Sequence, residues 1–123
     1  MIYGVGIDIV RVERIKRVIE KWGERFLKRV FTENEIAYCY KKTIPYLSLA
    51  VRFAAKEALI KAISSEVPVT LTDIEVINID TGKPFLKVSG KLEEFFVKKS
   101  IKKAHLSLSH EHEYGIACVV LEQ

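Results

Sequence analysis

Residues 45–64 read PYLSLAVRFAAKEALIKAIS, and this stretch decides the fold because it is apolar on nearly every side of one long helix. Pro45 suits the first turn of a helix, where its missing N–H costs nothing. A helix that is apolar all round is usually buried. Its small side chains suit close packing against a sheet: Ala54, Ala55, Ala58 and Ala62. The sequence therefore predicts a central helix from Pro45 to about Ser64.

The residues at the start of the chain predict a strand and a helix. Ile2–Val10 reads as a buried strand, in which Gly4 and Gly6 indicate that something approaches the backbone closely. Over Arg11–Trp22 the apolar residues recur at steps of three and four, which predicts an amphipathic helix. The same spacing places Trp22 in the core.

Shorter elements fill the rest of the chain. Phe26–Phe31 is expected to be a helical turn, and Thr32-Glu33-Asn34-Glu35 is a capping-box pattern that opens a helix to about Lys42. Downstream we expect a strand at 72–80, a turn at 80–84, a strand at 85–89, a helix at 91–100, and strands at 105–111 and 114–121. This order predicts an α+β fold, with a mostly antiparallel sheet packed against the long helix, in a single domain spanning 1–123.

Composition limits the classes of protein that fit. The chain has 123 residues, of which 49% are hydrophobic and 29% are charged, which is ordinary for a globular domain. We expect no membrane span and no signal peptide. Two cysteines, Cys39 and Cys118, lie far apart in the sequence, so we expect reduced thiols and a cytoplasmic protein.

Charge is distributed unevenly along the chain. The net charge is +4, and the bases gather in the first helices: Arg11, Arg14, Lys16, Arg17, Lys21, Arg25, Lys28 and Arg29. Such a cluster predicts an acidic partner, which could be nucleic acid, anionic lipid or an acidic protein.

Two carboxylates stand out as candidates for chemistry. Asp8 ends the first strand, and Glu57 shares a helix face with Lys61 four residues later. Taken alone, Asp8 could be a turn or cap residue and Glu57–Lys61 a surface pair. Together, the carboxylates can hold an octahedral Mg²⁺ that accepts phosphate oxygens. Lys61 could then neutralise or protonate a phosphate leaving group, so the set predicts phosphoryl-type transfer.

Other familiar sites are poorly supported. His105, His110 and His112 have no cysteine partner or helical spacing for zinc. Ser107 and Ser109 lie in no glycine-flanked nucleophile elbow. The sequence also contains no Walker A loop and no GxGxxG motif. A phosphate would therefore have to be held by a cation and a metal.

Several blocks of the sequence occur in an order and spacing typical of one family. They are GVGIDIV at 4–10 with Arg14-Ile15, RFAAKEALIKA at 52–62, DIE at 73–75, GKP at 82–84, and LSHE at 108–111 with Tyr114. Together these blocks resemble the holo-[acyl-carrier-protein] synthases, the short stand-alone class of bacterial 4′-phosphopantetheinyl transferases. The resemblance spans essentially the whole chain and implies the 4′-phosphopantetheinyl transferase-like fold.

The resemblance implies an activity and its partners. The enzyme would transfer 4′-phosphopantetheine from coenzyme A to a serine of apo-acyl carrier protein and release 3′,5′-adenosine bisphosphate, in support of fatty acid biosynthesis. The family's short members are homotrimers with active sites between subunits, so a homotrimer is expected.

The resemblance also implies roles for individual residues. Asp8 and Glu57 would bind Mg²⁺, and Lys61 would reach the coenzyme A pyrophosphate. His110 would lie near the nucleotide and take part in catalysis, and Arg52 would support the nucleotide phosphates. The serine proton would pass to Glu57 or to a water on the metal. The acidic carrier protein would dock on the basic helices through Arg14, Lys21 and Arg25.

One segment departs from the family pattern. The family usually has a Gly-Thr-Gly loop where this chain has Ile63-Ser64-Ser65-Glu66-Val67-Pro68. The sequence therefore does not determine the conformation of this loop near the nucleotide. Two other functions remain alternatives. A nucleic-acid-binding module would use the basic helix, although we expect only weak, non-specific binding. A metal-dependent phosphohydrolase would use the same Asp8–Glu57 pair.

Overall fold

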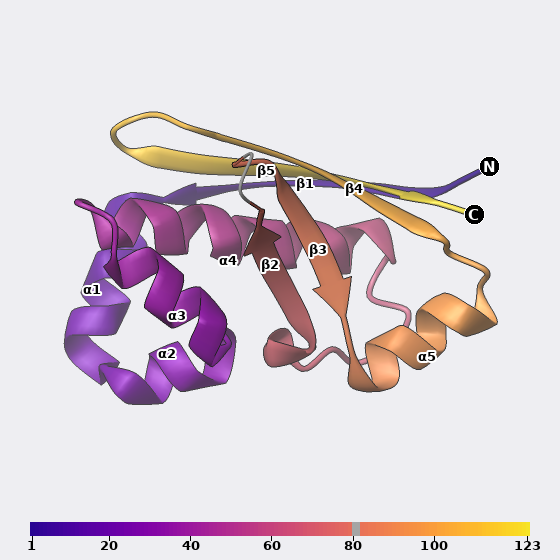
Figure 1. The fold of residues 1–123 in the computed structure, drawn as a ribbon, viewed down its shortest axis with the longest axis horizontal. Coiled ribbons are helices and arrows are strands. Elements are labelled where there is room, and N and C mark those ends of the chain that lie inside the picture. The colour runs from indigo at the N-terminus through magenta and orange to yellow at the C-terminus, as the bar shows by residue number, and fades with distance from the viewer. Residues whose placement is uncertain (80–81) are drawn as a thin grey trace.

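A computed structural model describes residues 1–79 and 82–123 (Figure 1). In chain order its elements are β1 Ile2–Arg11, α1 Val12–Trp22, α2 Glu24–Val30, α3 Glu33–Tyr40, α4 Pro45–Ala62, the short 3₁₀ helix η1 Leu71–Asp73, β2 Ile74–Asn78, β3 Pro84–Val88, α5 Gly90–Lys98, β4 Lys103–His110 and β5 Tyr114–Glu122. The predicted α+β fold is confirmed. In the part of the chain that the structure describes, no helix combines the length and apolar character needed to cross a bilayer.

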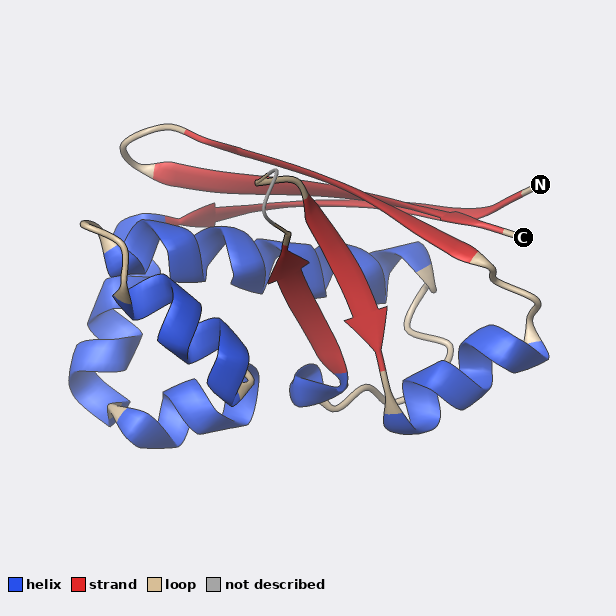
Figure 2. Ribbon diagram, viewed as in Figure 1, coloured by secondary structure: helices blue, strands red, loops and turns tan. Residues whose placement is uncertain are grey.

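The described strands form two antiparallel sheets. β1, β5 and β4 lie side by side in that order, and β2 pairs with β3 in a separate hairpin. Figure 2 shows α4 running along one face of the larger sheet, with the hairpin crossing beside the helix, where β3 contacts β4. Helices α1, α2 and α3 gather at one end of α4. The long helix is therefore enclosed as predicted, between the sheet and the smaller elements.

Close packing of α4 on β1 depends on the two glycines of the strand. A Cβ added to Gly4 would lie 1.9 Å from the Ala62 carbonyl oxygen, and one added to Gly6 would lie 1.8 Å from the Ala58 oxygen. Both distances are far shorter than any real contact. The glycines and the alanines thus let the two backbones touch, and the predicted close approach is confirmed.

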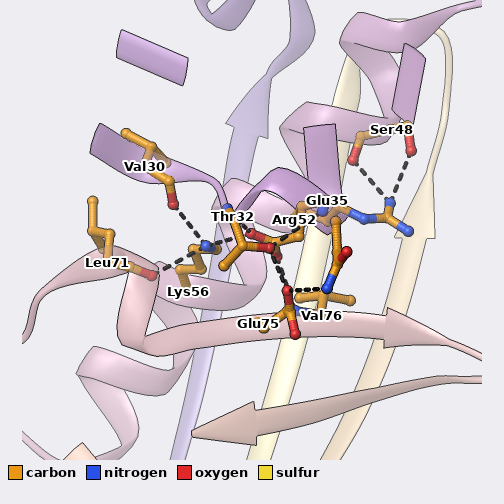
Figure 3. A network of polar contacts seen from close by, with 10 residues as sticks. Val30, Thr32, Glu35, Ser48, Arg52, Lys56, Leu71, Glu75 and Val76 are labelled. Carbon is orange, nitrogen blue, oxygen red and sulfur yellow. Dashed lines mark hydrogen bonds and ion pairs between the residues drawn. The ribbon is translucent and has the colours of Figure 1, made fainter. Parts of the chain in front are cut away.

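The capping box at the start of α3 is also confirmed. The Glu35 amide donates to Thr32 Oγ1 at 3.2 Å, and the Thr32 amide donates to Glu35 Oε1 at 2.9 Å. Glu35 does more than cap the helix, because its carboxylate is buried and accepts a hydrogen bond from Lys56 Nζ at 2.7 Å. Lys56 also donates to the carbonyl oxygens of Val30 and Leu71 at 2.6 and 3.1 Å (Figure 3).

Some expected boundaries were wrong, and each has a local cause. The strand expected from Thr72 begins at Ile74, because Leu71–Asp73 forms a 3₁₀ turn. The central helix ends at Ala62, since Ser64 and Ser65 both adopt the left-handed conformation with φ of 53°. Of the turn expected at 80–84, residues 80 and 81 lie outside the described residues.

The predicted burial of Trp22 was wrong as well. Its side chain is 51% exposed. α1 ends at Trp22, and Gly23 turns the chain with φ of 56°. The helical spacing that pointed Trp22 toward the core therefore stops at that residue.

The outer face of the larger sheet is apolar and open. Val5, Ile7 and Ile9 point away from α4 and are 59%, 62% and 60% exposed. In register beside them on β5 lie Val120, Cys118 and Ile116. No described helix covers this face (Figure 2).

Candidate active site

β1 and α4 bring three of the predicted site residues together: Asp8, Glu57 and Lys61. Asp8 lies two residues beyond Gly6, where the strand touches the helix. Lys61 Nζ donates to Asp8 Oδ1 at 2.9 Å and to the Ile7 carbonyl oxygen at 3.1 Å. Glu57 lies one helical turn before Lys61, on the same face of α4. The close packing of strand and helix thus places Asp8 beside the polar side chains of α4.

The pKa of Glu57 responds to the charges of Asp8 and Lys61. Its pKa is raised, mainly by burial and then by the negative charge of Asp8. The positive charges of Lys61 and Arg14 oppose that shift. A divalent cation would favour the ionised form of both carboxylates.

The donor set fits a hard divalent ion. Asp8 and Glu57 offer carboxylate oxygens, which Mg²⁺ prefers, and Mg²⁺ commonly takes only one or two protein carboxylates beside water and phosphate oxygens. Among residues 1–79 and 82–123, no group of three or more His, Cys, Asp or Glu side chains could hold a metal ion. A metal ion held by the two carboxylates Asp8 and Glu57 would take its remaining ligands from water or phosphate oxygens.

Arg52 and His110 lie at a second location, apart from the group formed by Asp8, Glu57 and Lys61 (the acidic group). Both line a pocket of about 670 Å³ to which Lys42 and Lys83 also contribute. None of Asp8, Glu57 and Lys61 lines it. The structure therefore divides the predicted site residues into an acidic group and a basic pocket.

Arg52 is buried and fixed from several sides. Its Nη1 donates to the carbonyl oxygen and the hydroxyl of Ser48, at 3.1 and 2.8 Å (Figure 3), and Nη2 donates to Asn78 Oδ1. The guanidinium lies 4.5 Å from the centre of the Tyr38 ring. Its Nε finds no hydrogen-bond partner among the described residues. A guanidinium on the wall of a pocket is suited to an anionic ligand.

The predicted docking residues are exposed at the helical end of the molecule. Arg14 and Lys21 lie on α1 and Arg25 lies on α2. Beside them is a groove of about 350 Å³ lined by Val18, Trp22, Arg25, Phe26 and Arg29. Reasoning from the sequence missed this groove because it assigned Trp22 to the core. The position of Trp22 directly before Gly23 was the signal that could have found it.

The other histidines lie apart from the acidic group. His105 Nε2 is 2.9 Å from Glu122 Oε1, and this hydrogen bond lowers the pKa of Glu122. His112 lines a small pocket with Arg11 and Glu13. Among the described residues, both cysteines are free thiols.

Comparison with known proteins identifies the chain as a 4′-phosphopantetheinyl transferase. The model of the 4′-phosphopantetheinyl transferase superfamily matches residues 4–119. Holo-[acyl-carrier-protein] synthases from Halothermothrix orenii and Thermodesulfovibrio yellowstonii are 46% and 47% identical to the chain, covering 100% and 98% of it and 99% of each relative. The chain belongs to the holo-[acyl-carrier-protein] synthase family.

Solved structures agree with this assignment. The holo-[acyl-carrier-protein] synthase from Neisseria meningitidis superposes with a TM-score of 0.92 at 34% identity, covering 100% of both chains. The enzyme from Bacillus anthracis, in complex with CoA, superposes with a TM-score of 0.82 at 38% identity, covering 100% of this chain and 98% of that one.

Proposed function

We propose that this chain transfers 4′-phosphopantetheine from coenzyme A to a serine of apo-acyl carrier protein, in support of fatty acid biosynthesis in the cytoplasm. The other product is 3′,5′-adenosine bisphosphate. The observation that carries the proposal is the meeting of Asp8 with Glu57 and Lys61 where β1 packs on α4, in a chain of this family. Two carboxylates and a lysine are the groups that a diphosphate and its metal require.

Asp8 and Glu57 would hold Mg²⁺ in this proposal. The bound ion would neutralise charge on the diphosphate as the phosphoryl group is transferred. Lys61 would bring its ammonium to the phosphate of the departing adenosine bisphosphate. Glu57 is also a candidate acceptor for the proton of the carrier serine.

The basic pocket would hold the nucleotide end of coenzyme A. Arg52, His110, Lys42 and Lys83 supply positive charge or hydrogen-bond donors there. His110 would thus contribute to catalysis by positioning the substrate. Since the pocket is separate from the acidic group in one chain, we propose that the complete site forms between neighbouring subunits of a homotrimer. The exposed apolar face around Val5, Ile7 and Ile9 supports such an assembly.

Carrier protein would dock on α1 and α2. Exposed Arg14, Lys21 and Arg25 would attract an acidic helix, and the groove between Trp22 and Phe26 would take an apolar side chain from it. Charge would then steer the encounter, and apolar burial would hold the complex.

The proposal is tested by mass spectrometry of apo-acyl carrier protein incubated with coenzyme A, Mg²⁺ and the enzyme. We expect each carrier to gain the mass of one phosphopantetheine, and the Asp8→Asn variant to lose this activity. A carrier of unchanged mass would contradict the proposal. So would release of adenosine bisphosphate from coenzyme A without any carrier, which would instead indicate a hydrolase.

A further inference from the structure

The Lys61 ammonium contacts Asp8, the carboxylate that a bound metal ion would also need. Its ammonium donates to Asp8 Oδ1 at 2.9 Å and to the Ile7 carbonyl oxygen at 3.1 Å. These are the contacts of a cation that lies against β1 at Ile7 and Asp8, three residues before the strand ends at Arg11. No other described side chain forms a hydrogen bond or ion pair with Asp8.

The two partners of this ion pair differ in their freedom to move. The Asp8 side chain is only 14% exposed, whereas that of Lys61 is 55% exposed. Asp8 belongs to a strand paired along its length with β5, so its backbone is held in place. Lys61 lies in the last turn of α4 on a flexible four-carbon stem, and its ammonium can leave without disturbing the backbone.

We infer that Lys61 is a built-in counter-cation, which neutralises Asp8 while the site is empty and moves to the diphosphate when metal and coenzyme A bind. This inference rests on the proposed function, since it assumes that Asp8 and Glu57 hold a divalent ion. Lysine and metal then compete for Asp8. Coenzyme A relieves the competition, because its diphosphate gives the ammonium a new partner.

Coupled binding follows from this competition. A ligand that removes Lys61 from Asp8 must tighten metal binding, and by linkage the metal must tighten coenzyme A binding by the same factor. Metal alone should therefore bind weakly, and metal with coenzyme A should bind strongly. The lysine would keep the site from filling with metal before the substrate arrives.

The test is a titration with Mn²⁺, following free Mn²⁺ by electron paramagnetic resonance with and without coenzyme A. Without coenzyme A, we expect Lys61→Met to bind Mn²⁺ about tenfold more tightly than the unaltered chain. Lys61→Arg keeps a cation on the same helix face and should bind as the unaltered chain does. Lys28→Met removes one exposed charge from α2 and should also leave Mn²⁺ affinity unchanged.

Coenzyme A adds a second expectation. It should tighten Mn²⁺ binding to the unaltered chain by about fivefold or more, and by clearly less in Lys61→Met. Unchanged or weaker Mn²⁺ binding by Lys61→Met without coenzyme A would overturn the inference. An equal gain in Lys28→Met would overturn it too, because net charge alone would then explain the effect.

An Asp8→Asn arm separates this inference from the proposed function. If Asp8→Asn loses Mn²⁺ binding while Lys61→Met fails to gain it, only the role of Lys61 is refuted. If Asp8→Asn binds Mn²⁺ as the unaltered chain does, the metal site itself is refuted, and the inference falls with it.

Discussion

Glu57 lies half-buried on α4, and its pKa is raised mainly by burial and then by the charge of Asp8. Its ionised form is therefore less favourable in the folded chain than in the unfolded one. The protonated Glu57 side chain contributes fully to the free energy of unfolding at low pH, where the carboxyl is protonated in both the folded and the unfolded chain. This contribution is lost as the pH rises through the raised pKa of the folded chain. The proposed mechanism uses the ionised form of Glu57, so in this proposal the residue serves function at a cost in stability.

Glu57→Gln separates these two effects. We expect the variant to lose about 10²–10³ in turnover, because an essential electrostatic group is gone. Without metal it should unfold at a higher temperature than the unaltered chain at neutral pH, and this advantage should vanish at low pH. Transfer assays and thermal unfolding across pH would measure both. Glu24→Gln, on an exposed part of α2, is the matched control. Normal turnover, or a variant that fails to fold, would contradict this account.

Individual site residues were predictable where local spacing reports geometry. Glu57 and Lys61 share a helix face by simple periodicity, and Asp8 follows the glycines that mark a close approach. No such rule places Arg52 and His110 together, because 26 residues separate Arg52 even from its partner Asn78 and the pocket is closed by tertiary packing. Trp22 was misplaced because periodicity does not report whether another element covers the last turn of a helix.

At the level of elements, a buried ion pair joins α4 to its neighbours. Lys56 reaches Glu35 on α3, the Val30 carbonyl of α2 and the Leu71 carbonyl of η1, while Glu35 Oε2 accepts from the Val76 amide of β2 at 2.8 Å (Figure 3). Burial lowers the pKa of Lys56, and the charge of Glu35 opposes that shift. A charge on a buried helix needs a partner, but the sequence could not name one 21 residues away.

Breaking this pair should be costly. Lys56→Met leaves the Glu35 carboxylate buried without its cation, so we expect a loss of about 3–5 kcal/mol in the free energy of unfolding. Urea denaturation would measure it. The double variant Lys56→Met with Glu35→Met should recover much of that loss, because it removes both charges. Lys28→Met breaks only an exposed pair and should cost at most about 1 kcal/mol. A similarly small effect of Lys56→Met would contradict the role of the ion pair.

The end of α4 stores backbone strain. Ser64 and Ser65 both have φ of 53°, a conformation that favours glycine, at the place where the family pattern has a glycine-containing loop. Ser65→Gly should raise the free energy of unfolding by about 1 kcal/mol, since the relieved strain exceeds the entropy cost of glycine. Ser109→Gly, in the regular strand β4, should instead lower it. Destabilisation by Ser65→Gly in the same assay would show that the hydroxyl group matters more than the strain.

Over the whole molecule, two open surfaces remain after the core is formed. The helical end is basic and carries the groove beside Trp22, and the outer sheet face is apolar. Uneven charge along the sequence predicted the first surface. The second could not be predicted, because alternating apolar residues on a strand do not say which face a helix will cover.

Arg25→Glu tests docking without touching the chemistry, whereas Arg14 also acts on the pKa of Glu57. We expect the variant to raise KM for the carrier protein about tenfold, equivalent to about 1.4 kcal/mol. KM for coenzyme A should stay unchanged. High salt should reduce the difference, since exposed charges are screened. Lys98→Glu on α5 is the matched control. Equal damage to both KM values would argue against a separate docking surface.

The central claim is that Asp8 and Glu57 bind one divalent ion together with the diphosphate of coenzyme A. A crystal structure with Mn²⁺ and coenzyme A, with the ion located by its anomalous scattering, tests it most directly. We predict a single strong peak between the two carboxylates, in contact with the diphosphate, and Lys61 moved from Asp8 to a phosphate oxygen. A peak elsewhere, or carboxylates that point to separate regions with no ion between them, would contradict the account.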